Sequence, residues 1–367
     1  MIMLDWDREH IFEDMCNEMA GKLKEDGLPI VAWGDTTKEM FVPFFERYGL
    51  SIDNICDKDN GKQNIVRNLG GGGKRIISPS EIDGLYKEYN AVILVPYPER
   101  IKAELNSFRN KPKRVFYIDI AKLHLHPMLF HRPNRKNFME KIEKLAQVEG
   151  FLEDSQSKQI LQNVLNYWIS GDRYYVRDYA EMQDKQYLDT MEFHGEEIFL
   201  NIGACDGRYS ERFRKMVGTY QKIYNFECDP NNFQKMKENL AGYRDCYFSR
   251  KGIWDKHDKL KFNADGNAGS CIREEGNIEI EVDSIDNMFK NVPITFIKAD
   301  IEGAEYRLLD GAQNTIKEYK PKLAICCYHQ MEDLIEIPLK IKEINPNYKI
   351  KIRHYTDTLT ETVCYAY

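Results

Sequence analysis

The first third of the chain alternates short apolar runs with amphipathic stretches. Apolar runs of this length predict buried strands, whereas apolar positions spaced three and four apart predict helices. The alternation is typical of a parallel sheet covered by helices on both faces. The predicted strands are residues 28–34, 51–59, 91–97 and 114–120, and the predicted helices are 38–49 and 98–108.

A polar stretch rich in Lys, Glu and Gln then predicts a helical connector, and from residue 197 the alternation returns. Alternating residues at 259–265 and 277–285 predict an antiparallel hairpin on one edge. Only a short turn joins the last two strands, 348–356 and 361–367, so they must be antiparallel. The other predicted strands are 197–203, 222–229, 246–254, 294–300 and 322–329, and the helices are 208–218, 230–242, 303–319 and 333–345.

These patterns divide the chain into a Rossmann-like N-terminal domain (1–130), a helical connector (131–184) and a second doubly wound α/β domain (185–367). The length of 367 residues suits this division, and 22 Tyr and 18 Phe exclude a mostly disordered chain. A net charge of −7 argues against a protein that mainly grips nucleic acid.

Cysteines and the N-terminal residues indicate the compartment. The nine cysteines include no C-x-x-C pair, so we expect reduced thiols. The first 15 residues mix apolar and charged side chains, unlike a signal peptide, and no apolar run approaches the roughly 20 residues of a membrane span. We expect a soluble cytoplasmic protein that acts on a small molecule or glycan, with neither nucleic acid nor a membrane span.

A glycine loop follows the first strand of the second domain, where doubly wound sheets bind ligands. It contains Gly203 and Gly207 but no third glycine, so the dinucleotide fingerprint is absent. Asp206 would repel a pyrophosphate, although a cationic ligand would tolerate it. Glu227, 24 positions after Gly203, can accept hydrogen bonds from ribose hydroxyls. Alternatively, Glu227 caps the next helix, or Asp229 holds the ribose.

Several sequence blocks resemble one family in order: "NIGACDGRYS", "YNFECDPNNF", "FIKADIEGAEYRLLDGA", "KPKLAICCYHQMEDLIEIP" and the last 23 residues. Residues 185–367 resemble the FkbM family of S-adenosylmethionine-dependent methyltransferases. The resemblance implies a class I methyltransferase fold with an antiparallel last strand, S-adenosylmethionine as cofactor, and methylation of a hydroxyl on a sugar or polyketide-type acceptor. Asn201 stands where many members carry Asp, which makes Asp206 the more suitable partner for the cofactor's amino group.

The predicted cofactor contacts follow from the glycine loop and the next strand ends. They are Asn201, Gly203, Ala204, Asp206, Gly207, Glu227, Asp229 and Gly252.

Three further polar residues, Asp300, Glu302 and His329, follow the fourth and fifth strands of this domain and form the predicted catalytic set. A hydroxyl acceptor benefits from a base, and the ordinary pKa of histidine suits His329 as general base or acceptor-orienting group. Alternatively, His329 is a helix cap or core residue, and the two acids cap the helix near Gly303. Glu305 reads as structural. A divalent cation held by the catalytic set is possible but not favoured, and no metal is predicted.

The remaining features suggest less chemistry. His124, His126 and His131 form a cluster without nearby Cys or carboxylates, which indicates a polar surface. The first domain resembles the Rossmann-like helper domain ahead of some sugar-modifying enzymes, although Gly34 alone is a weak phosphate signal. Gly70–Gly73 predict a mobile loop. We therefore expect an O-methyltransferase acting on a sugar or glycoconjugate hydroxyl; the alternatives are an N- or C-methyltransferase, or an inactive nucleotide-sugar-binding scaffold.

Overall fold

The computed structural model describes most of the chain. The histidine cluster of His124, His126 and His131 and the glycines at 70–72 lie outside the described residues. The described residues are 2–8, 10–34, 44–59, 61–68, 73–95, 98–118, 135–179, 182–264, 266 and 269–367.

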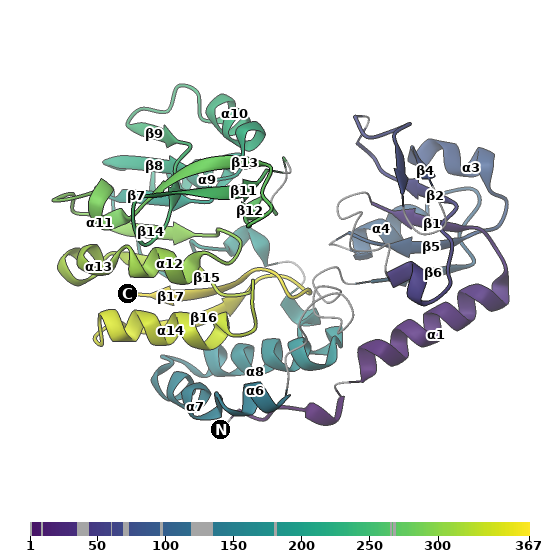
Figure 1. Ribbon diagram of the computed structural model, residues 1–367, viewed down its shortest axis with the longest axis horizontal. Helices are drawn as coiled ribbons and strands as arrows, with labels where there is room; N and C mark the ends of the chain where they lie inside the picture. The colour runs from purple at the N-terminus through teal and green to yellow at the C-terminus, as the bar shows by residue number, and fades with distance from the viewer. Residues whose placement is uncertain are drawn as a thin grey trace.

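The N-terminal domain contains a sheet with strand order β3-β4-β2-β1-β5-β6 (Figure 1). Side chains of its central strand alternate between two cores: Ile30 and Ala32 pack on the α1 side, and Val31 and Trp33 on the other. The strands are β1 Ile30–Trp33, β2 Asn54–Cys56, β3 Val66–Asn68, β4 Gly73–Ile77, β5 Asn90–Ile93 and β6 Arg114–Tyr117, and the helices are α1 Ile11–Asp26, α3 Ile82–Leu85 and α4 Pro98–Leu105.

Two strands of this sheet were not predicted. β3 pairs antiparallel with β4, and β4 pairs parallel with β2. Gly73, predicted as part of a mobile loop, instead begins β4. Pairing with neighbouring strands decides this conformation, because a short segment with four glycines carries no apolar periodicity of its own.

The connector helices share a core with the C-terminal sheet. Leu145 of α7 (Ile142–Phe151) and Val164 of α8 (Ser155–Ser170) lie in one cluster with Ile350 and Ile352 of β16 (Ile350–His354). Backbone amides of residues 2, 3 and 5 bind side chains of α7 and α8. Smaller helical segments are α6 Arg135–Met139, η1 Trp6–Arg8, η2 Pro79–Glu81, η3 Arg173–Tyr175, η4 Arg177–Tyr179 and η5 Gln183–Lys185.

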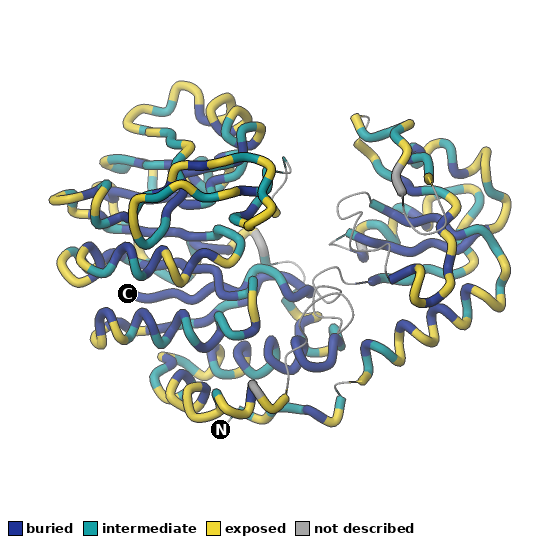
Figure 2. The backbone as a smooth tube through the Cα atoms, in the orientation of Figure 1, coloured by how far each residue is buried: buried dark blue, intermediate teal, exposed yellow. Residues whose placement is uncertain are grey.

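The C-terminal sheet has strand order β16-β17-β15-β14-β7-β8-β9. β17 runs antiparallel to both β15 and β16, as predicted, and the other pairings are parallel. Its central strands are buried between layers of helices (Figures 1 and 2). The expected α/β class with an antiparallel last strand is therefore confirmed. The further strands are β7 Ile198–Ile202, β8 Lys222–Phe226, β9 Cys246–Ser249, β14 Phe296–Ala299, β15 Lys322–Cys326 and β17 Thr362–Ala366.

Helices connect these strands. They are α9 Arg208–Val217, α10 Pro230–Asn239, α11 Ile285–Met288, α12 Glu305–Asp310, α13 Gln313–Tyr319 and α14 Asp333–Ile344. The predicted helix 303–319 is divided at Gly311, where a Cβ atom would lie 2.1 Å from the carbonyl oxygen of Trp254. The tight packing of two chain segments at this point interrupts the helix.

A second, four-stranded sheet replaces the predicted edge hairpin. β11 (Asp258–Asn263) and β13 (Ile278–Asp283) are antiparallel, as expected, and are joined by β10 (Gly252–Ile253) and β12 (Cys271–Ile272) in the order β10-β13-β11-β12. The predicted strand 246–254 therefore divides between two sheets. Its amphipathic pattern contains no mark of the point where the chain changes partners.

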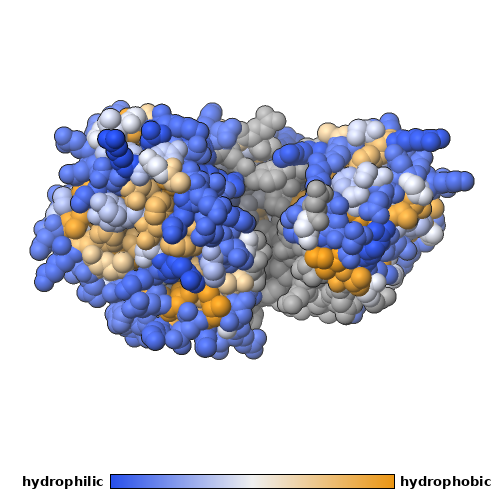
Figure 3. All heavy atoms as spheres, turned by 90° about the horizontal axis from the view of Figure 1, so that it is seen from above, coloured by the Kyte–Doolittle hydropathy of each residue, from blue (hydrophilic) through white to orange (hydrophobic). Residues whose placement is uncertain are grey.

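Polar side chains cover much of the described surface in Figure 3. In the described part of the chain, which includes all nine cysteines, no disulfide bond is formed. Across the ranges that the structure describes, no helix combines the length and apolar composition that crossing a membrane requires.

Candidate active site

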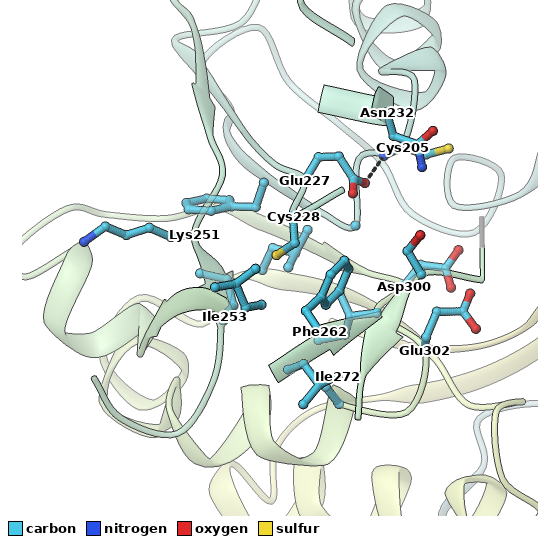
Figure 4. A pocket seen from close by; sticks show the side chains of 18 of the residues that line it. Cys205, Glu227, Cys228, Asn232, Lys251, Ile253, Phe262, Ile272, Asp300 and Glu302 are labelled. Atoms are coloured by element: carbon cyan, nitrogen blue, oxygen red, sulfur yellow. Dashed lines mark hydrogen bonds between the residues drawn. The ribbon is translucent and has the colours of Figure 1, made fainter. Parts of the chain in front are cut away.

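A pocket opens at the carboxyl ends of β7, β8 and β14. About 810 Å³ of space in and above it, open solvent included, is free of protein atoms. Five residues of the predicted set line it: Gly203, Glu227, Gly252, Asp300 and Glu302. Figure 4 shows Glu227 in the same pocket as the acids after β14, with side chains of the four-stranded sheet forming another wall.

Close packing holds the glycine loop at the pocket. Gly203 has a φ of +70°, and a Cβ atom there would lie 1.8 Å from the carbonyl oxygen of Asp300, so no larger residue fits. The amides of Gly203 and Ala204 both donate to the carbonyl of Phe226, at 3.0 and 2.9 Å. Below the loop, the buried Lys298 ammonium donates to the carbonyl oxygen of Gly203 at 2.7 Å. Backbone contacts on both sides thus fix the loop.

Glu227 follows β8 and is 8% exposed. Its two carboxylate oxygens accept hydrogen bonds from the backbone amides of Cys205 and Asp229, each at 2.8 Å; Figure 4 shows the bond to Cys205. Burial raises the pKa of Glu227 to about 7. Each oxygen keeps a second lone pair, so the side chain can still accept hydrogen bonds from a ligand in the pocket.

Asp229 caps α10 instead of lining the pocket. It accepts hydrogen bonds from the amides of Asn231 and Asn232, at 2.9 and 3.1 Å. Its other oxygen binds the amide of Gly266 and the hydroxyl of Ser270. Between the two acids considered for the ribose, Glu227 is therefore the one whose carboxylate lies in the pocket.

The other predicted cofactor residues lie around the loop. The side-chain amide of Asn201 donates hydrogen bonds to the side chains of Ser210 and Asn225 inside the domain, at 2.9 and 3.2 Å. Asp206 forms a two-pronged ion pair with Arg208. Ala204 packs in the cluster of Met236, and Gly207 is the N-cap of α9. Their roles toward a cofactor stay predictions.

Asp300, Glu302 and His329 come together at the edge of the pocket. Nε2 of His329 lies 3.5 Å from Asp300 and 3.6 Å from Glu302. Nδ1 lies 3.1 Å from Glu305, whose carboxylate also accepts hydrogen bonds from the amides of Ile301 and Gly303. Parallel pairing of β14 and β15 brings these residues to one edge. Glu305 thus supports both the loop and the imidazole.

Comparisons with known proteins give a family match and a fold match. Residues 201–347 match the family model described as the methyltransferase FkbM domain. This part of the chain is therefore similar to the FkbM methyltransferases. The crystal structure of a methyltransferase FkbM from Methylobacillus flagellatus KT is 21% identical and covers 98% of this chain and 100% of its own, with a TM-score of 0.64, so the fold is shared across both domains.

More distant structures match part of the chain. The Aeropyrum pernix fibrillarin structure, with natively bound S-adenosyl-L-methionine, is 9% identical and covers 47% of this chain and 67% of its own, with a TM-score of 0.32. A search of curated proteins gives no match.

The surrounding charges and burial give the ionisable groups of this site different protonation states. Burial alone would lower the pKa of His329, but the carboxylates of Glu305 and Glu302 raise it well above the usual value. Burial raises the pKa of Glu302. Burial would also raise the pKa of Asp300, but the charges of Lys298 and His329 lower it. At neutral pH, His329 therefore favours its protonated form.

Two residues of this site, Glu361 and Lys298, were not predicted from the sequence. Glu361, in the turn before β17, lines the pocket, and burial together with Asp300 raises its pKa to about 7. Only the insertion of β17 beside β15 brings it there, so the sequence carried no signal. For Lys298 a sequence signal did exist, because a lysine inside the apolar run "ITFIKAD" is expected to be buried and then needs a hydrogen-bond or ion-pair partner.

Proposed function

We propose that this chain transfers the methyl group of S-adenosylmethionine to an acceptor bound in the pocket. The observation that carries the proposal is that Gly203 and Glu227 line the same pocket as Asp300 and Glu302. The closely packed glycine loop and the two free acceptor positions of Glu227 fit an adenosine-type ligand with two ribose hydroxyls. When bound, S-adenosylmethionine supplies an electrophilic methyl group.

The acceptor that suits this site best is a hydroxyl of a sugar or glycoconjugate. Besides Glu227, three carboxylates line the pocket, those of Asp300, Glu302 and Glu361. Carboxylates accept hydrogen bonds from hydroxyl groups and repel anions, which favours a neutral, hydroxyl-rich acceptor.

Within the cluster of Asp300, Glu302 and His329, we propose that His329 orients the acceptor oxygen and that Glu302 accepts the proton of the acceptor hydroxyl. A protonated imidazole cannot accept a proton, but it can position neighbouring carboxylates and an acceptor oxygen. Glu302 lies 3.6 Å from His329, lines the pocket and has a raised pKa, which makes its carboxylate the stronger base. Positioning of the acceptor oxygen for in-line attack supplies much of the expected rate enhancement.

The first test measures S-adenosylhomocysteine binding by calorimetry. Glu227→Gln should weaken binding about tenfold, because a neutral amide replaces an acceptor of charge-assisted hydrogen bonds. Affinity of the unmodified chain should fall as the pH drops below about 7, where Glu227 takes up a proton, and the variant should lose this dependence. Glu238→Gln, a matched change of an exposed acid on α10, should change neither result.

No binding to the intact, folded chain would overturn the cofactor assignment. Equal affinity of the Glu227→Gln variant and the unmodified chain would remove Glu227 from the site.

The second test identifies the acceptor atom. The chain is incubated with S-adenosylmethionine labelled on its methyl group and with nucleotide sugars and glycans from the source cell, and products are analysed by mass spectrometry. We expect the label on a carbohydrate oxygen. Label on nitrogen or carbon would contradict O-methylation while leaving the cofactor assignment intact.

A further inference from the structure

The imidazole of His329 is enclosed by carboxylates but makes no hydrogen bond to any described residue. Its side chain is only 8% exposed, and both ring nitrogens are buried. A buried polar ring without a hydrogen bond costs free energy unless something else satisfies it. Nε2 points between Asp300 and Glu302, at 3.5 and 3.6 Å, distances too long for good hydrogen bonds.

These three side chains also have the spacing of a ligand set. One ligand atom from each of Asp300, Glu302 and His329 lies within 4.8 Å of the others. A cation between them would lie about 2 Å from each oxygen and nitrogen, as divalent metals do.

The surroundings match those of metal-bound histidines. Glu305 lies 3.1 Å from Nδ1, and its negative charge favours a proton on Nδ1, which leaves the lone pair of Nε2 free for a metal. Glu305 is itself fixed by two backbone amides. The hydroxyls of Tyr187 and Tyr328 donate to Asp300, each at 3.0 Å, and hold its carboxylate in place. The ligand set is therefore supported before any ion enters.

The balance of charged side chains around the pocket also favours a bound cation. Asp300, Glu302 and Glu361 all line the pocket, while the ammonium of Lys298 is turned toward the backbone of the glycine loop. Even with a protonated His329, carboxylates outnumber cations here. A divalent ion would compensate the surplus in a partly desolvated place, where like charges repel strongly.

We propose that Asp300, Glu302 and Nε2 of His329 bind a divalent cation of the Mg²⁺ or Mn²⁺ class. Two carboxylates and one imidazole suit such an ion, and the open side of the ligand set faces the pocket. There the ion would replace the Nε2 proton of His329 and polarise the acceptor hydroxyl, and so take over the activating role that Glu302 has in the ion-free site. The inference rests on the proposed function, since it concerns the same acceptor site.

The test titrates the EDTA-treated full chain with Mn²⁺ and follows the electron paramagnetic resonance signal of the free ion. We expect one Mn²⁺ per chain, displaced by excess Mg²⁺. Glu302→Gln and His329→Gln should each weaken binding at least tenfold, because each removes one ligand. Glu332→Gln is the matched control: it removes the charge of an acid three residues from His329 whose side chain is 45% exposed, and should leave binding unchanged.

Thermal unfolding and S-adenosylhomocysteine calorimetry on the same samples show that each variant is folded. If the unmodified chain binds Mn²⁺ no more tightly than Glu302→Gln, the cation site is overturned. Binding of S-adenosylhomocysteine without binding of Mn²⁺ would overturn the cation site and leave the proposed cofactor intact. Mn²⁺ binding at these residues without binding of S-adenosylhomocysteine would support the cation site and overturn the proposed cofactor.

Discussion

Lys298 shows how much one buried residue can determine at this site. Its ammonium is 1% exposed, donates to the carbonyl oxygens of Gly203 and Ile202, and lies 5.2 Å from the centre of the Tyr187 ring. Its charge also lowers the pKa of Asp300, against the effect of burial. One side chain thus links the glycine loop to the acidic cluster, and we regard it as a positioning residue.

Lys298→Met should therefore weaken S-adenosylhomocysteine binding. The substitution leaves the carbonyl oxygen of Gly203 without its donor, a loss of about 1–3 kcal/mol when buried, and the loop is freed to move. Calorimetry should show a decrease in affinity of about tenfold or more. The matched control is Lys259→Met on β11, whose side chain is 70% exposed, and it should bind normally. Normal binding by Lys298→Met in a folded variant would contradict the positioning role.

At the scale of elements, the carboxylate of Asp154 links the N-terminus of α8 to strand β16. Asp154 caps α8 by accepting a hydrogen bond from the amide of Ser157 at 2.7 Å. Its other oxygen accepts from the guanidinium of Arg353 on β16, at 2.6 Å. The same side chain thus begins the helix and joins it to the edge strand of the C-terminal sheet.

Asp154→Asn should lower the free energy of unfolding by about 1–2 kcal/mol at neutral pH, because it weakens a cap and a charged pair. Burial would raise the pKa of Asp154, but hydrogen bonds from Arg353 and Ser157 lower it below the ordinary 3.8. The stabilisation is therefore present above about pH 4 and is lost as the pH falls further. Denaturant unfolding at pH 7 and at pH 3 measures this.

The difference in the free energy of unfolding between the unmodified chain and Asp154→Asn should be smaller at pH 3 than at pH 7. A constant gap would mean that the charge of Asp154 contributes nothing. Asp178→Asn, a change at a side chain that is 87% exposed, should have no measurable effect at either pH.

At the scale of the whole molecule, the pocket lies in the C-terminal part of the chain, between the seven-stranded and the four-stranded sheets. The C-terminal sheet and its helices hold the pocket, and the connector helices extend their core. The N-terminal sheet has cores of its own on both faces. The similar structure from Methylobacillus flagellatus KT covers 98% of the chain, so the shared fold extends over both the N-terminal and the C-terminal parts. The predicted boundaries at residues 130 and 184 stay predictions.

The sequence by itself determined the alternating elements, the antiparallel last pair and the identity of Glu227, Asp300, Glu302 and His329 as candidates. Apolar periodicity and residue chemistry are local properties, so they can be read along the chain. Strand partners are not local. The change of sheet after β9, the insertion of β17 that brings Glu361 to the pocket, and the enclosure of His329 by three carboxylates were decided only by the tertiary structure, because they depend on contacts between segments far apart in the chain.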